Sequence, residues 1–465
     1  MPLAKRVRDL ISVVRLRPFD TSSEEGRSRE RYRRAALSSL ATTFTTGLSV
    51  LISFASVPIT IGYLGKERYG LWMTMSSLVA MFAFADLGIG NGMMNAIAGA
   101  HGRDDREAAR RFLASALGVV LVLAAVGLVA LAVAYPFVPW ARVFNVSTAE
   151  AAAEAGPATA ILFGCFFFGL PLALVGRAQS AYQEGFVPAL WSAAGSLLSF
   201  SALLTVVFLK AGLPWLVLAL GATPMLAQIG NSIWQLGVSR PWLRPRLGDF
   251  QWRRGVQMVR LGVLFVILQL TVAVTYTSDN VVIAQVLGPT SVTDVAVAGK
   301  LFNLAPMAWG IVLGPLWPAY TEAITRGDRA WVKKTLIGST ILTVVFAALF
   351  SAAVVLFGNA ILRVWTRQDI HAPLLLMLGL AAWTTMNAAA TAVSIFMNGA
   401  HIVRFQIIIA LVTGSIAFPL KFWMTRRIGM AGPVWTTVIC YAIFAAIPMA
   451  WMVPKMVNAP PRSPG

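Results

Sequence analysis

Long apolar stretches separated by short polar segments run along almost the whole chain. Each stretch holds about twenty residues or more, enough for a helix to cross a hydrocarbon core of roughly 30 Å. The alternating ten-residue segments of a transmembrane β-barrel are not present in the sequence. The pattern therefore predicts an all-α polytopic membrane protein with about twelve transmembrane helices. The predicted spans are 36–63, 70–98, 112–135, 158–178, 188–209, 213–235, 258–287, 295–322, 335–357, 373–395, 403–424 and 431–453.

Several residues at and near the ends of these stretches recur 223 positions later in the chain. The matched pairs are Leu64-Gly65 with Leu287-Gly288, Asp105 with Asp328, Arg110-Arg111 with Lys333-Lys334, and Leu113, Ala124 and Ala125 with Leu336, Ala347 and Ala348. Matches between apolar residues are common by chance in such a hydrophobic chain. The evidence for a repeat is therefore the match of the glycine, the acid and the double base. They indicate a duplicated unit of six spans, so the two halves have the same orientation in the membrane.

Composition and charge agree with this fold class. The chain of 465 residues is 57% hydrophobic and 12% charged, whereas a soluble protein carries about 25% charged residues. The net charge of +19 comes from basic loops. About 28 Lys and Arg residues fall in one set of loops and about 9 in the other, which predicts that both termini are cytoplasmic. No nucleic-acid partner is needed to explain the charge.

Five segments follow from these patterns. Residues 1–34 form a cytoplasmic basic leader, which is either an interfacial helix or disordered. The others are a lobe of six spans at 35–240, a cytoplasmic linker at 241–257, a second lobe at 258–454 and a disordered tail at 455–465. Cys165 and Cys440 both fall inside apolar spans, so no disulfide framework is implied.

The residues around the repeat also carry a family likeness. The stretch VPITIGYLGKERYGLWMTMSSLVAMFAFADLGIGNGMMNAIA (57–98) resembles the first two spans of polysaccharide and O-antigen flippases. Residues 262–288 are similar to their seventh span, and GPLWPAYTEAITRGDRAWVKKTL (314–336) resembles the end of their eighth span and the loop after it. These proteins belong to the multidrug/oligosaccharidyl-lipid/polysaccharide (MOP) exporter superfamily. The likeness covers approximately residues 35–455.

The resemblance implies two six-helix lobes around a central cavity, as in the MATE and MurJ transporters. It implies an inner-membrane flippase that moves an undecaprenyl-pyrophosphate-linked oligosaccharide by alternating access, for surface polysaccharides such as the O-antigen of lipopolysaccharide. Membrane lipids and the polymerase or assembly proteins of that pathway are its implied partners. The alternative is a cation-coupled multidrug antiporter of the MATE branch, which commonly has an acid in its first span. Residues 36–63 contain no charged residue.

Two acids fall inside predicted spans, where an ionised carboxylate is costly. Asp86 lies near the middle of the second span and is followed by Gly88, Gly90, Asn91 and Gly92, which weaken a helix. It is either part of a polar patch that titrates or binds a cation, or a cap on a broken helix. Asp279 lies roughly 12 Å from the outer end of the seventh span. We expect Lys300 in the next span to meet it, as a structural ion pair or as a gate or proton-linked site.

Basic and amide side chains near the spans are the candidates for substrate contacts. Arg177, Arg260 and Lys421 lie near span ends, where they either reach the interface or bind phosphate. The candidates for a lipid pyrophosphate are Arg177, Arg260 and Lys300, and Arg177 is preferred because it ends the fourth span on the predicted cytoplasmic side. The candidates for a polar cavity lining are Asn91, Gln228, Gln269 and Asn303. Their alternative role is to join helices, at around 0.6 kcal/mol each.

Signals of catalysis are missing from the sequence. It contains no GxxxxGK[ST] phosphate loop, and its three histidines, at 101, 371 and 401, form no metal-binding pattern. No nucleophile with a neighbouring base can be recognised. The sequence therefore predicts a transporter that is not an enzyme and has no cofactor and no metal ligand.

Overall fold

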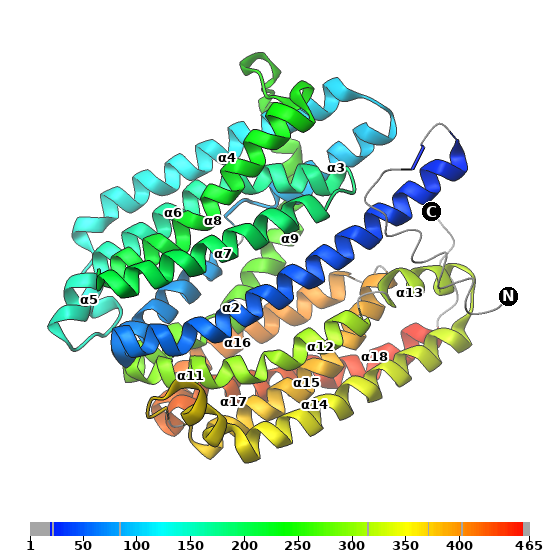
Figure 1. Ribbon diagram of the computed structural model, residues 1–465. Coiled ribbons are helices and arrows are strands. Elements are labelled where there is room, and N and C mark those ends of the chain that lie inside the picture. The colour runs from blue at the N-terminus through cyan, green and yellow to red at the C-terminus, as the bar shows by residue number, and fades with distance from the viewer. Residues whose placement is uncertain are drawn as a thin grey trace. The chain divides into compact units, whose positions relative to one another are not determined.

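The structure is a computed structural model that describes residues 19–20, 23–82, 85–313, 316–370, 372–400 and 403–458. Over these residues it consists of helices and turns, with no strand (Figure 1). The α-helices are α2 (Glu24–Met81), α3 (Ile89–Gly102), α4 (Arg106–Ala134), α5 (Trp140–Val143), α6 (Ala149–Ala181), α7 (Phe186–Leu209), α8 (Leu213–Trp234), α9 (Trp252–Tyr276), α10 (Asp279–Leu287), α11 (Pro289–Phe302), α12 (Leu304–Leu313), α13 (Leu316–Thr325), α14 (Arg329–Thr366), α15 (Leu374–Gly399), α16 (Val403–Ile428), α17 (Gly432–Tyr441) and α18 (Ile447–Asn458). Most of the predicted basic leader and most of the predicted tail lie outside the described residues.

Eight helical stretches of the described chain are long and apolar enough to cross a membrane. Two of them, Arg33–Met81 and Phe405–Lys455, have 49 and 51 residues, about twice what one crossing needs. Other predicted spans are built from shorter helices, such as α9 with α10, and α11 with α12 and α13. Each of the twelve predicted spans overlaps one or more of these helices. The chain is thus an all-α, multi-pass membrane protein.

The two glycines of the repeat have the same unusual backbone conformation. Gly65 has φ 75° and ψ 170°, and Gly288 has φ 87° and ψ 162°. Only glycine adopts this region readily, because a Cβ atom would clash with the backbone there. At both places one residue redirects the chain between two helices, so the Leu-Gly pair is a structural element of each half.

The aspartates of the repeat begin equivalent helices. Asp105 Oδ1 accepts the N–H of Ala108 at 2.8 Å at the start of α4. Asp328 Oδ1 accepts the N–H of Trp331 at 3.0 Å at the start of α14. Each bond satisfies a backbone donor that a first helical turn leaves free, worth about 1 kcal/mol. The repeated acid therefore has the same N-capping role in both halves.

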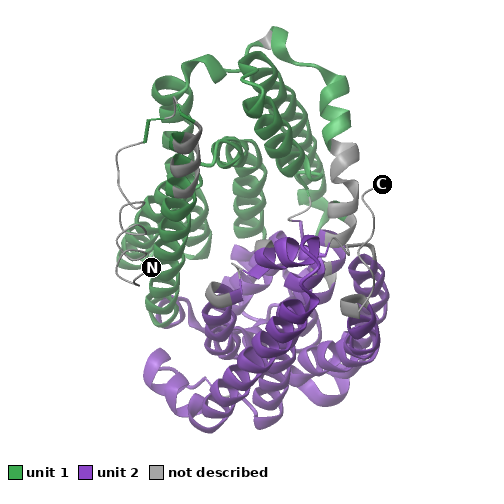
Figure 2. Cartoon of the chain, turned by 90° about the vertical axis from the view of Figure 1, so that its right-hand side faces the viewer, with its two compact units in different colours: residues 1–59, 84–139, 156–266 green, residues 60–83, 140–155, 267–465 purple. Residues whose placement is uncertain are grey.

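Two compact units make up the chain (Figure 2). Unit 1 contains residues 1–59, 84–139 and 156–266, and unit 2 contains residues 60–83, 140–155 and 267–465. Residues 140–155 belong to unit 2 because Glu67 accepts hydrogen bonds from Ser147 and Thr148, and Asn145 donates to the carbonyls of Ala284 and Gln285. The predicted lobes place 60–83 and 140–155 in the first half instead, and the lobe boundaries stay a prediction.

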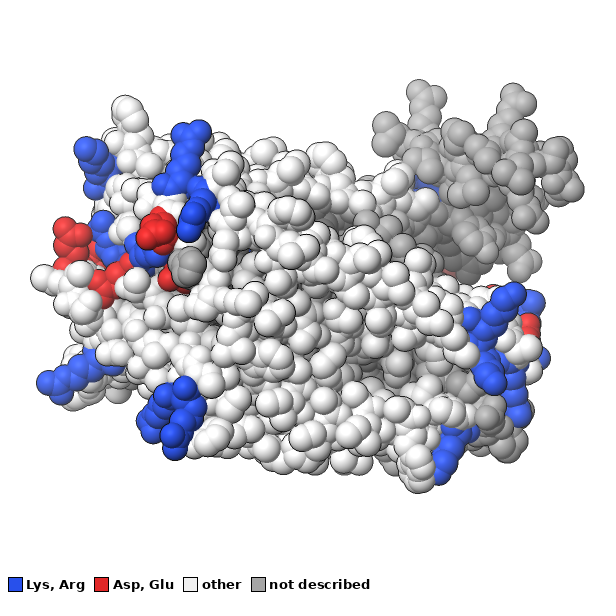
Figure 3. Space-filling view, turned by 90° about the horizontal axis from the view of Figure 1, so that it is seen from below, with Lys and Arg blue, Asp and Glu red and all other residues white. Residues whose placement is uncertain are grey.

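Each unit has its own apolar core. In unit 1, α3, α4 and α6 pack together around Met93, Leu113 and Leu174, and the linker contributes Leu243. In unit 2, one core joins α13, α14, α15 and α18 around Tyr320 and Phe396. On the face shown in Figure 3, charged side chains gather at the helix ends, and the surface between them carries almost none. This distribution suits helices whose middle lies in hydrocarbon.

Candidate functional site

Asp86 lies in unit 1 in the turn before α3, where the backbone leaves helical geometry. Leu87 and Gly88 have φ of 50° and 70°. The Asp86 carboxylate accepts the N–H of Gly88 at 2.9 Å and, through its other oxygen, the N–H of Gly90 at 3.4 Å. A carboxylate at this position satisfies free donors and complements the helix dipole. Of the two roles predicted for Asp86, its contacts fit the cap on a broken helix.

Arg177 reaches the same turn from α6. Its Nη1 donates to Asn91 Oδ1 at 3.0 Å. A Cβ atom built on Gly90 would lie 3.0 Å from Asp86 Oδ2 and 3.8 Å from Arg177 Nε, so the acid and the guanidinium flank one backbone position. The structure thus brings together three residues that the sequence proposed separately. Glycine at position 90 leaves room for both side chains.

The Arg177 side chain is exposed, and within the described part of the chain it forms no ion pair. A guanidinium has five N–H donors in a planar fork, and the bond to Asn91 uses one of them. Its other donors are available to a ligand. Among the predicted cations in unit 1, this is the one whose geometry suits an external anion.

Polar residues deeper in unit 1 bind one another. Gln179, on α6, is fully buried and donates to Asn231 Oδ1 at 2.7 Å, and Asn231 returns a bond to Gln179 Oε1 at 2.9 Å. Gln179 also donates to Gln235 Oε1 at 3.3 Å. These amides join α6 to α8, which is the helix-joining alternative of the sequence analysis. Sequence analysis missed Gln179, although it lies only two residues from Arg177.

A cluster of charges surrounds the end of α6. Glu184 binds both terminal nitrogens of Arg240, at 2.6 and 2.8 Å, and lies 3.5 Å from Arg34. The Arg240 guanidinium also lies 4.2 Å from the ring centre of Tyr182. Burial, followed by the nearby Arg240 and Arg34, lowers the pKa of His101. These contacts join Arg240, just before the linker, and the start of α2 to the turn after α6, and sequence patterns gave no sign of them.

A buried ion pair lies in unit 2, and it corrects a prediction. Asp279 pairs with Lys421 of α16, which is fully buried, and not with Lys300 of α11. The Lys421 ammonium also donates to the carbonyl of Thr275 and lies 3.4 Å from Ser278 Oγ. The prediction considered only the neighbouring span and missed a partner 142 residues away. Lys421 does not extend to an interface, as was one expectation for it.

The pair lies where a transmembrane helix is interrupted. α9 ends at Tyr276 and α10 begins at Asp279, so carbonyl groups near the end of α9 lose their helical donors. Lys421 supplies a donor to one of them, at Thr275, while its charge is matched by Asp279. Next to this break, Tyr276 stacks on Trp383 with ring centres 5.3 Å apart. The ion pair therefore stabilises this helix break, at which free backbone groups would otherwise be exposed in an apolar region.

Comparison with known proteins decides the family. The model of a family described as "Polysaccharide biosynthesis protein" matches residues 36–324. The chain belongs to the polysaccharide biosynthesis protein family. No curated protein matches it in sequence.

Solved structures show the fold of this family member. An inward-facing multidrug-resistance MATE family transporter of the MOP superfamily superposes with a TM-score of 0.64 at 18% identity, covering 88% of this chain and 98% of the transporter. The lipid II flippase MurJ in an inward closed conformation gives 0.68 at 15% identity, covering 91% and 89%. An outward-facing MATE transporter gives 0.61 at 17% identity, covering 92% and 96%. The polysaccharide biosynthesis protein thus has the fold of the MOP exporter superfamily, as the resemblance of its sequence implied.

The remaining predicted residues of this family member are dispersed. Arg260 belongs to α9, but its side chain lies outside the described part of the structure. Gln269 is half-buried on α9, and Asn303 is exposed between α11 and α12. Gln228, on α8, buries its Oε1 with no partner among the described residues. A cavity role for these residues, and a coupling role for Asp86 or Asp279, stay predictions.

Proposed function

We propose that this protein is a transporter that moves an oligosaccharide linked to undecaprenyl pyrophosphate across the bacterial inner membrane by alternating access. The description of its family names polysaccharide biosynthesis, and its fold is that of MOP exporters. Polysaccharide precursors carried on a lipid need a protein to move their polar part through the membrane, because sugars and phosphates are poorly soluble in hydrocarbon. Substrate, location and mechanism are parts of this one proposal.

The exposed Arg177 is the observation that carries the proposal. A lipid pyrophosphate presents several anionic oxygens, and a guanidinium fork binds phosphate with two parallel hydrogen bonds. Arg177 has donors to spare and forms no ion pair with a carboxylate of the described chain. Asp86 already occupies the N-terminus of α3, so the phosphate would bind to Arg177 and not to the helix itself.

The position of Arg177 suits the start of the transport cycle. It lies four residues before the end of α6, about 6 Å along the helix, and the cluster of Arg34, Glu184 and Arg240 follows that end. The excess of basic residues in this set of loops favours a cytoplasmic location. A precursor made in the cytoplasm would therefore reach Arg177 from the side where it is assembled.

A complementation experiment tests the proposal. In a strain that lacks the gene, the wild-type protein should restore surface polysaccharide, and Arg177→Ala should leave lipid-linked precursor accumulated on the cytoplasmic leaflet. Loss of hydrogen bonds to a charged group costs about 1.5–3 kcal/mol, which corresponds to a roughly 10- to 100-fold weaker interaction with the precursor. Arg177→Lys should retain part of the activity, because it keeps the charge and loses the fork.

The matched control is Arg103→Ala, which removes an exposed arginine from the turn after α3 in the same unit. It should export normally. Full export by Arg177→Ala at a normal protein level would remove Arg177 from the site. If the deletion instead left surface polysaccharide unchanged and raised sensitivity to cationic drugs, the flippase proposal would fail and the antiporter would replace it.

A further inference from the structure

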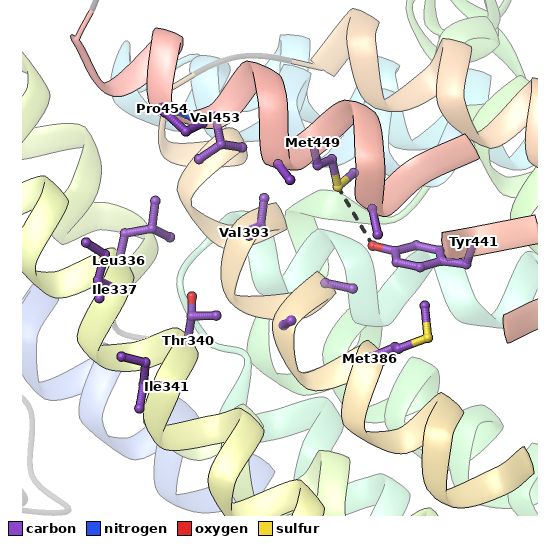
Figure 4. Close-up of a pocket in the computed structure, with 14 residues that line it drawn as sticks. Leu336, Ile337, Thr340, Ile341, Met386, Val393, Tyr441, Met449, Val453 and Pro454 are labelled. Atoms are coloured by element: carbon purple, nitrogen blue, oxygen red, sulfur yellow. Dashed lines mark hydrogen bonds between the residues drawn. The ribbon is translucent and has the colours of Figure 1, made fainter. Parts of the chain in front are cut away.

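Unit 2 contains an apolar cavity of about 420 Å³ between α14, α15 and the stretch from Tyr441 to Pro454 (Figure 4). Thr340 and Tyr441 are the only polar side chains in its lining, and the Tyr441 hydroxyl donates to Met449 Sδ at 3.8 Å. On the α14 side, Ile337 and Ile341 contribute to the wall. The lining is suited to a hydrocarbon chain and offers almost nothing to a polar ligand.

The internal repeat shows what covers the equivalent surface in unit 1. At the offset of 223 residues, the stripe of α14 beside the cavity corresponds to a stripe of α4. The corresponding pairs are Ile337 with Ala114, Gly338 with Ser115, Ile341 with Gly118, and Leu342 with Val119. The shared N-caps at the start of both helices fix this register.

The linker covers the stripe on α4. A Cβ atom built on Gly118 would lie 2.5 Å from the ring of Phe250, so the aromatic ring packs directly on the helix at this point. Ser115 accepts the N–H of Gln251 at 3.0 Å, and Val119 packs against Gly255. The unit 1 stripe is therefore buried under a segment of the chain itself.

The stripe on α14 has no such cover within the described structure. Ile337, Ile341 and Leu342 are 50%, 57% and 59% exposed, whereas their counterparts Ala114 and Val119 are each 6% exposed. The two equivalent helices therefore differ in one respect. The Phe250 ring fills the place beside α4, whereas no described residue fills the place beside α14.

The repeated double base shows the same difference in charge. Arg110 binds both oxygens of Asp249, at 2.8 and 3.2 Å, and Arg111 pairs with Glu107. Their counterparts Lys333 and Lys334 are exposed and form no ion pair with any residue that the structure describes. They lie four and three residues before Ile337, so they share its face of the helix and mark one end of the cavity.

We propose that the cavity beside α14 binds an anionic phospholipid, with one acyl chain against Ile337 and Ile341 and the phosphate on Lys333 and Lys334. In unit 1 the same place is filled by an apolar ring next to a carboxylate, Phe250 beside Asp249, and the carboxylate neutralises Arg110, the first residue of the double base. An anionic phospholipid offers the same pair of groups, an apolar chain next to a negative charge. The occupant is a resident lipid that completes unit 2, not the transported substrate.

Native mass spectrometry of the full chain tests this site. The protein is reconstituted in vesicles of phosphatidylcholine with an equal part of phosphatidylglycerol, and lipid retained after mild extraction is counted. Wild-type protein should retain one phosphatidylglycerol in preference to phosphatidylcholine. A lysine near an anionic headgroup contributes about 1 kcal/mol, so Lys333→Ala/Lys334→Ala should bind about thirty-fold more weakly. Ile341→Trp, which fills the cavity while the lysines remain, should also lose the lipid.

The matched control is Arg326→Ala, which removes an exposed basic residue shortly before α14. It should retain phosphatidylglycerol as wild type does. Because Lys333 and Lys334 are exposed, their replacement should not disturb folding, which thermal unfolding in detergent checks. Equal retention of phosphatidylglycerol by the double variant and wild type would overturn the proposal. Equal retention of the two lipids by wild type would also overturn it, and another occupant would then cover the stripe.

Discussion

The ion pair of Asp279 and Lys421 allows the sharpest test of how the second half is held together. Replacing Lys421 by methionine keeps a long side chain in a fully buried place but removes the ammonium. The change leaves Asp279 without its cation and the carbonyl of Thr275 without its donor. Both losses fall at the break between α9 and α10, where the backbone has no helical partner to replace them.

The structure sets the size of the expected effect. Removing one partner of a buried ion pair costs about 3–5 kcal/mol. Asp279 is 30% exposed, so water can solvate its charge in part, and we expect Lys421→Met to cost about 3 kcal/mol. Asp279→Asn should cost at least as much, because it leaves the ammonium with no exposure and only neutral acceptors. The double variant should be less destabilised than the sum of the two by about 2 kcal/mol.

Thermal unfolding in detergent with a thiol-reactive dye measures these differences, since Cys440 is buried in α17 and becomes reactive only on unfolding. The exposed pair of Glu322 and Arg326 provides a control cycle, because side chains 61% and 75% exposed should be coupled by about 0.5 kcal/mol or less. Additive effects of the two single variants would refute the argument, since the two groups would then not act as a pair.

Two further predictions concern the repeat glycines and the start of α2. Gly65→Ala and Gly288→Ala should each destabilise the protein by about 1–3 kcal/mol because their backbone conformation excludes a Cβ atom, while Gly62→Ala, at an open helical position, should not lower the unfolding temperature. The hydrogen bond from Arg33 lowers the pKa of Glu30 from 4.5 to about 2, so this carboxylate contributes stability above pH 4.5 that is lost as the pH falls towards 2. Thermal unfolding over this range should show that decline in wild type, and Glu30→Gln should lack this part of it.

Much of the fold could be predicted from the sequence because hydrocarbon imposes a length on every span. Twenty apolar residues allow few structures other than a helix, and the acids at 105 and 328, which the sequence matched as a repeat, begin equivalent helices in the two halves. Interruptions inside a predicted span were less visible than those between two spans. The change of direction at Gly65 falls in the predicted gap between the spans 36–63 and 70–98, where Lys66, Glu67 and Arg68 follow it. The break after Tyr276 falls inside a predicted span and has no proline or glycine within it.

The individual residues of the candidate site could be predicted from the sequence, but their arrangement in space could not. Asp86, Asn91 and Arg177 each stood out as polar groups in or near apolar spans, yet Arg177 and Asn91 are 86 residues apart and meet only through the packing of α6 on α3. Lys421 was expected either to reach the interface or to bind phosphate, because hydropathy alone cannot distinguish a buried cation from one near a span end. Its role depends on an acid and a free carbonyl that another helix supplies.

The intramembrane acids mark points at which the two halves depart from their repeat. Position for position, Asp279 corresponds to Ser56, inside α2, and Asp86 corresponds to Trp309, inside α12. Each acid thus lies where its own half interrupts a helix that the other half continues. Asp86 accepts the N–H groups freed at the start of α3, and the partner of Asp279 donates to a carbonyl freed at the end of α9. A charge in the membrane is retained in both cases because it satisfies backbone groups released by a break. The positions of these breaks therefore differ between the two halves, and the acids follow from them.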